Sequence, residues 1–210
     1  METKDIIVIS ISVLSFILAF STFYFNIIRK AIIAVSIGDK VHIYHLRKNT
    51  AFYIRFNIIN TSKKSGRISK IVLEVIDPEG NARRMPYLGR YLYDNNEYTQ
   101  VSGRQHFFLE SERLLSDQLL WFWWNRERNE MPITSGLYKF KLFVWCNHSR
   151  TPLKTDSKNL TITDASASVL EERYALGTDS RTLIFGFDEN HMMGLYAVKG
   201  DRSKWHHLVP

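Results

Sequence analysis

Residues 52–80 read FYIRFNIINTSKKSGRISKIVLEVIDPEG, and their pattern decides the expected fold. In residues 52–58 apolar side chains alternate with Arg55 and Asn57, which is the period of a strand buried on one face. The polar segment TSKKSGR then predicts a turn, and ISKIVLEVID predicts a second strand that ends at the turn PEGN. Short strands separated by frequent turns point to an antiparallel β fold.

Other runs in the chain repeat this alternation. They are AIIAVSI (31–37), VHIYHL (41–46), SGLYKFKLFVW (135–145) and SKNLTIT (157–163). The residues GDK (38–40) predict a turn between the first two runs. In the third run Lys139 and Lys141 point away from the apolar face. Because no long amphipathic helix lies between these runs, we expect an antiparallel sandwich rather than a parallel sheet.

An uncharged apolar segment precedes the predicted strands. Residues 6–28 read IIVISISVLSFILAFSTFYFNII, and as a helix they would be about 34 Å long, enough to cross a hydrocarbon core of about 30 Å. Phe23, Tyr24 and Phe25 suit the membrane interface. The preceding METKD is not net basic, and no small-residue cleavage site precedes Arg29. The pattern therefore favours a transmembrane anchor in residues 1–30 over a cleaved signal peptide.

Basic residues are concentrated directly after this segment. Residues 29–72 carry a net charge of +9, whereas the whole chain carries +7. Lys4 alone precedes the segment, so the positive-inside rule predicts a single-pass protein of the inner or plasma membrane with its C-terminal domain in the cytoplasm. We expect this basic juxtamembrane face to contact the bilayer through anionic lipid headgroups. Its members are Arg29, Lys30, Lys40, Arg47, Lys48, Lys63, Lys64 and Arg67.

The stretch 52–80 resembles a strand pair of immunoglobulin- or fibronectin-like sandwiches, with its Asn, its polar turn and its D-P-x-G turn. The start of 135–145 is similar to the G-x-Y strand entry of such domains. An apolar anchor followed by such a domain resembles uncharacterised bacterial single-pass membrane-anchored proteins. The resemblance covers about 31–163 and implies an immunoglobulin-like β-sandwich, but it implies no functional residues. Cys146 is the single cysteine, so an intrachain disulfide is impossible.

Two regions do not fit a minimal sandwich of residues 31–163. Residues 83–134 are expected to form an irregular, aromatic insertion. Residues 164–210 are expected to form a C-terminal appendage with a short helix in ASASVLEERYALG and a hairpin of RTLIFGF (181–187) and MMGLYAV (192–198). This short α/β tail either pairs with the main sheet or stands apart from it.

The insertion contains LLWFWWNRER at residues 119–128, with three of the five tryptophans. As a helix or as a strand, this run is apolar on both sides. It is therefore a buried element or a cover over the open end of the sandwich, unless it is an exposed contact patch. Our hypothesis is that it covers the membrane-facing end and contacts lipid or a neighbouring subunit. The candidate contact residues are Trp121, Phe122, Trp123, Trp124, Arg126 and Arg128.

Signatures of catalysis are weak. The chain has no phosphate-binding loop, dinucleotide-binding glycine pattern, H-E-x-x-H or G-x-S-x-G. Cys146 and His148 are two apart at a strand end, where a thiolate nucleophile or, with His191 or Asp188, a metal site is conceivable. We favour a half-buried cysteine beside an edge histidine. We expect no catalytic residue, metal or cofactor.

Tyr44, Tyr53 and Phe56 are interleaved with Lys and Arg, which is the composition of a single-stranded nucleic-acid platform. Because the membrane is the nearer polyanion, nucleic acid is not an expected partner. The leading expectation is a non-enzymatic, membrane-tethered interaction module that holds a protein or small-molecule partner at the membrane surface. One alternative is a ligand-responsive effector or sensor subunit whose anchors oligomerise, which admits a homo-oligomer. The other is an enzyme that uses Cys146 with His148.

Overall fold

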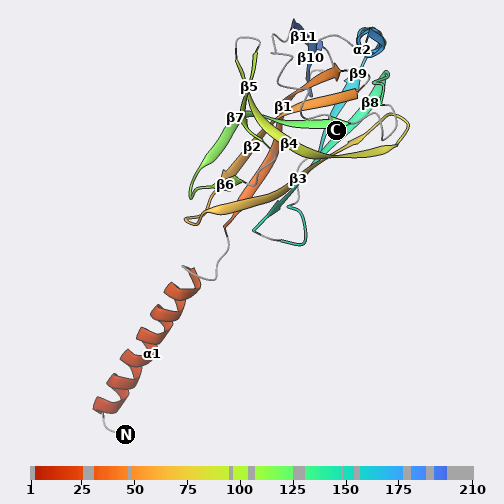
Figure 1. The fold of residues 1–210 in the computed structure, drawn as a ribbon. Helices are drawn as coiled ribbons and strands as arrows, with labels where there is room; N and C mark the ends of the chain where they lie inside the picture. The colour runs from red at the N-terminus through yellow and green to blue at the C-terminus, as the bar shows by residue number, and fades with distance from the viewer. Residues whose placement is uncertain are drawn as a thin grey trace.

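The computed structural model describes residues 3–25, 31–46, 49–94, 97–103, 107–124, 131–147, 149–153, 157–176, 181–187 and 192–197. An N-terminal helix, α1 (Thr3–Phe23), stands apart from a mainly β domain (Figure 1). A second helix, α2 (Asp164–Leu176), covers the end of the β domain that lies far from α1 (Figure 1).

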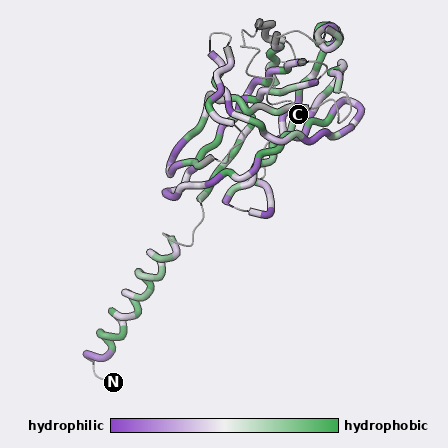
Figure 2. Tube along the Cα trace, viewed as in Figure 1, coloured by the Kyte–Doolittle hydropathy of each residue, from purple (hydrophilic) through white to green (hydrophobic). Residues whose placement is uncertain are grey.

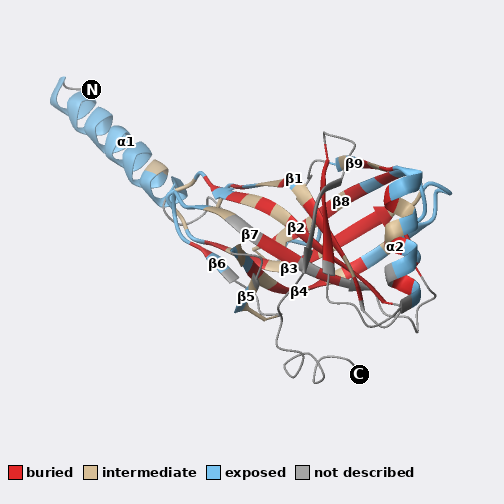
Figure 3. Cartoon of the chain, turned by 90° about the horizontal axis from the view of Figure 1, so that it is seen from above, coloured by how far each residue is buried: buried red, intermediate tan, exposed pale blue. Residues whose placement is uncertain are grey.

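Helix α1 confirms the predicted apolar helix. Its 21 residues extend about 31 Å, which is long enough to cross a bilayer. None of its residues is buried, and its large apolar side chains are between 48% and 70% exposed (Figures 2 and 3). In water such exposure would be unfavourable, so the helix has the composition of a membrane segment.

The described strands form one continuous antiparallel sheet in the order β11-β10-β1-β2-β7-β4-β3-β8-β9, with β5 paired to β4 and β6 paired to β3. The strands are β1 (Ile33–Leu46), β2 (Asn49–Asn60), β3 (Gly66–Ile76), β4 (Ala82–Asp94), β5 (Glu97–Ser102), β6 (Phe107–Leu109), β7 (Leu114–Trp124), β8 (Gly136–Cys146), β9 (Ser157–Ile162), β10 (Arg181–Gly186) and β11 (Met192–Ala197).

Strand β4 joins the two halves of the sheet. Its first part, residues 82–86, pairs with β3, and its second part, residues 87–92, pairs with β7. The sheet thereby curls into a nearly closed, barrel-like shape (Figure 1). The two halves pack face to face, and the ring centroids of Phe52 on β2 and Phe140 on β8 are 5.6 Å apart. The core lies between these halves (Figure 3).

The alternation in 52–58 places its apolar side chains as expected. Phe52, Ile54, Phe56 and Ile58 are all fully buried in this core. The structure thus confirms a mainly antiparallel β domain behind an apolar helix. The narrower prediction of an immunoglobulin-like sandwich is not confirmed, because one hydrogen-bonded sheet continues through both halves.

The expected turn at residues 38–40 is instead an irregularity within one long strand. The pairing of β1 with β2 shifts register between Ile37 and Val41, so the extra residues bulge without ending the strand. A Cβ on Gly38 would lie 2.9 Å from the Cβ of Arg55. Glycine at this position therefore signals a close approach between neighbouring strands rather than a chain reversal.

The expected irregular insertion at residues 83–134 is also corrected. This region supplies β4, β5, β6 and β7, and β7 lies between β2 and β4 in the sheet. The aromatic run that opens at Leu119 belongs to β7, in which Leu120 and Phe122 pack in the core and Leu119 packs on the opposite face. A strand covered on both faces loses the apolar–polar alternation that reveals a strand in sequence.

The C-terminal region contains the predicted helix and the predicted hairpin. Thr163 Oγ1 accepts a hydrogen bond from the backbone N–H of Ser166 at 3.3 Å, which caps the start of α2. Leu170 and Tyr174 turn toward the β domain and are buried. Strand β10 pairs with β1, so the hairpin extends the main sheet rather than standing apart from it.

Candidate interaction surface

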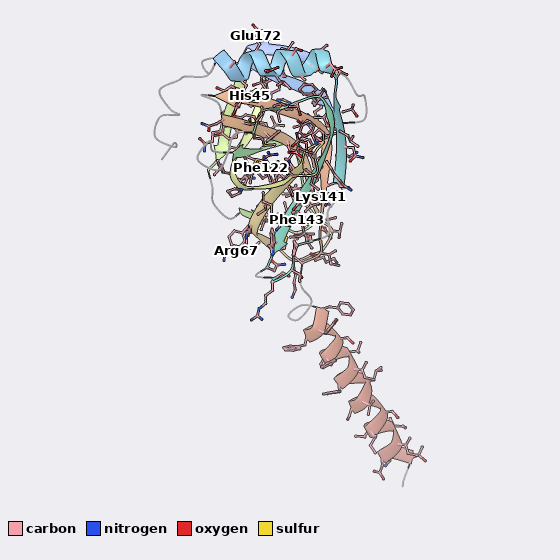
Figure 4. All side chains as sticks on the ribbon, turned by 90° about the vertical axis from the view of Figure 1, so that its right-hand side faces the viewer. His45, Arg67, Phe122, Lys141, Phe143 and Glu172 are labelled. Atoms are coloured by element: carbon pink, nitrogen blue, oxygen red, sulfur yellow. The ribbon has the colours of Figure 1, made fainter. Side chains whose placement is uncertain are left out.

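The aromatic run 119–128 does not form the exposed patch of our hypothesis in its described part. Phe122 is fully buried in the core, between the two halves of the sheet (Figure 4). Leu120 lies beside it, and Leu119 packs on the opposite face of β7. The contact role proposed for Phe122 is therefore wrong. The side chains of Trp121, Trp123 and Trp124, and all of Arg126 and Arg128, lie outside the described residues.

A tyrosine-rich cluster covers the outer face of β1 and β2. The ring of Tyr98 stacks on Tyr53 at 4.3 Å, and its hydroxyl lies 2.5 Å from His42 Nδ1. Burial, aided by the charges of Lys40 and Arg55, lowers the pKa of His42 to about 3, so this imidazole is neutral at physiological pH. The cluster is consequently a second small core.

Burial also affects two of the rings that lie among the basic residues of 29–72. Tyr53 is 4% exposed, and Phe56 is fully buried on the other face of β2. A base needs an exposed ring on which to stack. The interleaved rings of the basic segment therefore offer no stacking platform at these two positions.

Cys146 is buried at the end of β8. Burial raises the pKa of its thiol to about 11, so the thiol stays protonated at neutral pH, which disfavours it as a nucleophile. His148, its proposed partner, lies outside the described residues. Among the residues that are described, no three His, Cys, Asp or Glu side chains are grouped closely enough to hold a metal ion.

A different surface combines cations with partly exposed aromatic groups. It is the outer face of β3, the first part of β4, and β8, which we call the β3–β4–β8 face. Its outward-pointing residues are Lys70, Val72, Glu74, Ile76, Arg84, Pro86, Lys139, Lys141, Phe143 and Trp145. Four of these are cations and one is a carboxylate, so the face is net positive. Two residues of the β3–β4–β8 face, Lys141 and Phe143, are labelled in Figure 4.

Glu74 is the centre of a charge triad on the β3–β4–β8 face. Its carboxylate accepts a hydrogen bond from Arg84 Nε at 2.7 Å and lies 3.4 Å from Lys141 Nζ. Burial alone would raise the pKa of Glu74, but Arg84 and then Lys141 outweigh this and hold the pKa below its ordinary value. Glu74 therefore stays ionised at neutral pH, and the triad carries one net positive charge.

The part of the face nearer to α1 is aromatic. Phe143 and Trp145 lie 6.4 Å apart between ring centroids, and both side chains are partly exposed. Lys70 Nζ sits 4.9 Å from the centre of the Trp145 ring, a cation–π contact. Lys70 therefore occupies one face of the Trp145 ring.

Sequence reasoning missed Phe143 and Trp145, although their signal is visible. In SGLYKFKLFVW, Lys139 and Lys141 occupy outward positions, and the next two outward positions are Phe143 and Trp145. Large aromatic groups at the solvent-facing positions of a half-buried strand break the expected alternation. Such a break is the sequence signal that marks this partly exposed aromatic pair.

The predicted basic juxtamembrane face is only partly assembled. Lys63 and Lys64 lie in the turn between β2 and β3, and Arg67 lies at the start of β3, at the end of the domain nearest α1 (Figure 4). Lys40 lies midway along β1, away from that end. The remaining predicted members, Arg29, Lys30, Arg47 and Lys48, lie outside the described residues.

No protein-family profile matches the chain, and no curated protein matches it. Among solved structures, the chain is similar to the ApaA protein from Bordetella pertussis, with 9% identity, a TM-score of 0.34, and coverage of 64% of this chain and 91% of that one. It is also similar to a β-glucuronidase from glycoside hydrolase family 2, with 12% identity, a TM-score of 0.35, and coverage of 61% of this chain and 12% of that one. Neither likeness is strong enough to bear on function.

Proposed function

We propose that this protein is a non-enzymatic, membrane-tethered interaction module. Helix α1 crosses an inner or plasma membrane once, and the β domain stands in the cytoplasm at the membrane surface. There the β3–β4–β8 face binds an acidic segment of a protein partner. The observation that carries this proposal is α1 itself, an apolar helix of 21 residues with no buried residue.

The proposed orientation of α1 across the membrane rests on the unequal charge of its two flanks. Lys4 is the only basic residue before the apolar segment, whereas Arg29 and Lys30 follow it at once and more cations lie beyond them. Short flanks of this kind usually stay on the cytoplasmic side when they are basic. The basic side of the helix is also the side on which the β domain begins.

The β domain supports a binding role more readily than a catalytic one. Its interior is filled by apolar side chains, and its buried histidines, His42 and His45, have lowered pKa values of about 3 and about 4 because of burial. The proposal includes the narrower fold expected from the sequence, an immunoglobulin-like sandwich over residues 31–163, which the face-to-face packing of the two halves supports.

A defined acidic peptide tests the binding face. The full chain in lipid nanodiscs is titrated with a labelled peptide of alternating Glu and Phe, and binding is followed by fluorescence anisotropy. Lys70→Glu with Lys139→Glu is expected to weaken binding by roughly 5- to 30-fold, since each reversal removes about 0.5–1 kcal/mol of favourable interaction. Lys70 and Lys139 both belong to the proposed face.

The matched control is Lys40→Glu with Lys64→Glu, which changes the net charge equally but leaves the β3–β4–β8 face intact. Only a minor loss of binding is expected for this pair. A peptide of alternating Lys and Phe should bind far more weakly than the acidic peptide. Equal weakening by both pairs of substitutions would show that the β3–β4–β8 face is not the binding site. Equal binding of both peptides would contradict the preference for an acidic segment.

A further inference from the structure

We propose that the end of the β domain nearest α1 inserts apolar side chains into the headgroup region of an anionic bilayer. This end, called here the juxtamembrane rim, consists of Ile32, Ile59, Lys63, Lys64, Arg67, Phe108 and Leu114. The proposal rests on the proposed function in one respect, since it requires α1 to cross the membrane. It adds a second contact between protein and lipid, made by the β domain.

Hydrogen bonds hold the elements of the rim together at the point where the chain enters the domain. The backbone N–H of Thr61 donates to the carbonyl of Ile32 at 3.0 Å, and the N–H of Ile32 donates to Ser62 Oγ at 3.2 Å. The N–H of Glu112 donates to the carbonyl of Ser62 at 3.1 Å. The turn before β3 and the turn before β7 are thus fixed beside the first residues of the domain.

The tether keeps this end close to the membrane. Phe25 is the last described residue on the anchor side, and Ile32 lies seven residues later. Seven fully extended residues span at most about 25 Å. The rim therefore begins, at Ile32, no more than about 25 Å from Phe25. Because the short connection tethers the rim to α1, the effective concentration of the rim at the bilayer is far higher than that of an untethered domain.

The rim exposes large apolar side chains where a soluble domain would carry polar ones. Phe108 is 71% exposed, Leu114 53%, Ile32 44% and Ile59 40%. Ile59 and Leu114 are directly paired across β2 and β7, so they form one apolar surface. A grouping of exposed apolar side chains at one end of a domain marks a contact surface.

The charges around these side chains match an anionic bilayer. Phe108 pairs with Arg67 across β6 and β3, and Lys63 and Lys64 lie in the adjoining turn. Two acids, Glu110 and Glu112, also lie at this end, and Glu110 forms an ion pair with Arg113. With Arg113 included, four cations stand against two carboxylates. Basic groups around an apolar wedge are the usual composition of a peripheral membrane contact.

Site-directed spin labelling of the full chain in vesicles tests the inference. In a Cys146→Ala background, nitroxides are placed by Phe108→Cys, Leu137→Cys and Val13→Cys. The vesicles contain phosphatidylcholine with or without phosphatidylglycerol. Collision with oxygen, which favours lipid, is compared with collision with a nickel chelate, which favours water. Leu137 is the matched control, because it is 55% exposed on β8 but lies outside the rim.

The expected result is a higher oxygen-to-nickel ratio at position 108 than at 137, with a larger difference in anionic vesicles. Lys63→Glu with Lys64→Glu should abolish the anionic preference, whereas Lys139→Glu with Lys158→Glu should leave it. Suppose that the label at 13 is lipid-exposed and the label at 108 is as water-exposed as the label at 137. This result would contradict insertion of the rim but leave the membrane-crossing helix of the proposed function intact. A water-exposed label at 13 would overturn the proposed function as well.

Circular dichroism and thermal unfolding of each labelled chain check that it is folded. If Phe108→Cys disturbs folding, Leu114→Cys replaces it as the rim site, because Leu114 is also an exposed rim residue on a different strand. Lipid exposure at 114 then supports the inference, and water exposure at 114 contradicts it.

Discussion

Asn60 ties the two turns of the juxtamembrane rim to each other. Its side chain is fully buried at the end of β2. Its Nδ2 donates to the carbonyl of Lys64 at 2.5 Å, of Leu109 at 3.3 Å and of Glu110 at 2.9 Å. Its Oδ1 accepts a hydrogen bond from the N–H of Ser62 at 3.1 Å. One amide thus fixes the conformation that presents Lys63 and Lys64.

We expect Asn60→Ala to lower the free energy of unfolding by about 2–3 kcal/mol, because several carbonyls in a partly buried site lose their donor. Asn159 provides the control, since it is an exposed asparagine on β9. Asn159→Ala should change stability by less than about 0.5 kcal/mol. Urea unfolding of the full chain in detergent, followed by circular dichroism, measures both. Similar losses for the two variants would contradict the role given to Asn60.

Glu74 makes stability depend on pH in the acid range. Its pKa in the folded protein lies below the ordinary value of 4.5, although burial opposes this, because Arg84 and Lys141 stabilise the carboxylate. A lowered folded-state pKa means that the contribution to stability is complete above pH 4.5. It is lost as the pH falls through the folded-state pKa.

The variant Glu74→Gln removes this titration while keeping the shape of the side chain. We expect the stability difference between the natural chain and Glu74→Gln to be largest at about pH 6 and to shrink toward about pH 3. Urea midpoints at several pH values measure it. Asp77 titrates in both proteins and cancels from the difference. A difference that stays constant across this range would show that the triad does not stabilise the folded state.

Helix α2 closes the end of the barrel that lies away from α1, and Leu170 is its main buried contact. We expect Leu170→Ala to lower the free energy of unfolding by about 2–4 kcal/mol, through lost apolar burial and a residual cavity. Glu172→Ala, on the exposed side of the same helix, should be nearly neutral. Thermal unfolding compares the two. Equal melting temperatures would mean that α2 contributes little to the stability of the barrel.

Most elements that sequence reasoning predicted have a visible period or composition in the sequence, even where, as in the first half of β2, the structure buries both faces. Strands β2, β3 and β8 alternate clearly, and α1 and α2 follow from an apolar run and a helical pattern. Strand β7 was missed because every position of residues 119–124 is large and apolar, so this part of the sequence has no period to detect. The long strand β1 was divided at Gly38, because a bulge and a turn use the same residues.

The candidate surfaces were harder to predict from the sequence than the helices and strands. The concentration of cations after the anchor was visible, and the structure gathers Lys63, Lys64 and Arg67 at the end nearest α1. The aromatic run was misleading, because Phe122 faces the core. The β3–β4–β8 face depends on pairing between strands, which places Lys70 opposite Trp145 and Glu74 opposite Lys141. Sequence alone does not specify such pairs when several registers preserve the same alternation.

At the scale of the whole molecule, three features act together. A helix with no buried residue leads within a short connection to a β domain. The near end of that domain carries cations and exposed apolar groups, and the outer face of β3, β4 and β8 carries cations and aromatic groups. The anchor and the rim together would hold the domain at the membrane, and the face would remain open to a partner.

The central claim is that α1 crosses the membrane with the β domain on the cytoplasmic side, and accessibility labelling tests it most directly. Cys146 is replaced by Ala, and Glu172→Cys on the exposed side of α2 becomes the single reporter. Intact cells and lysed cells are treated with a membrane-impermeant maleimide. The account predicts labelling only after lysis, with the protein remaining in the membrane fraction under alkaline extraction. Labelling of intact cells would place the β domain outside the cytoplasm and contradict the account.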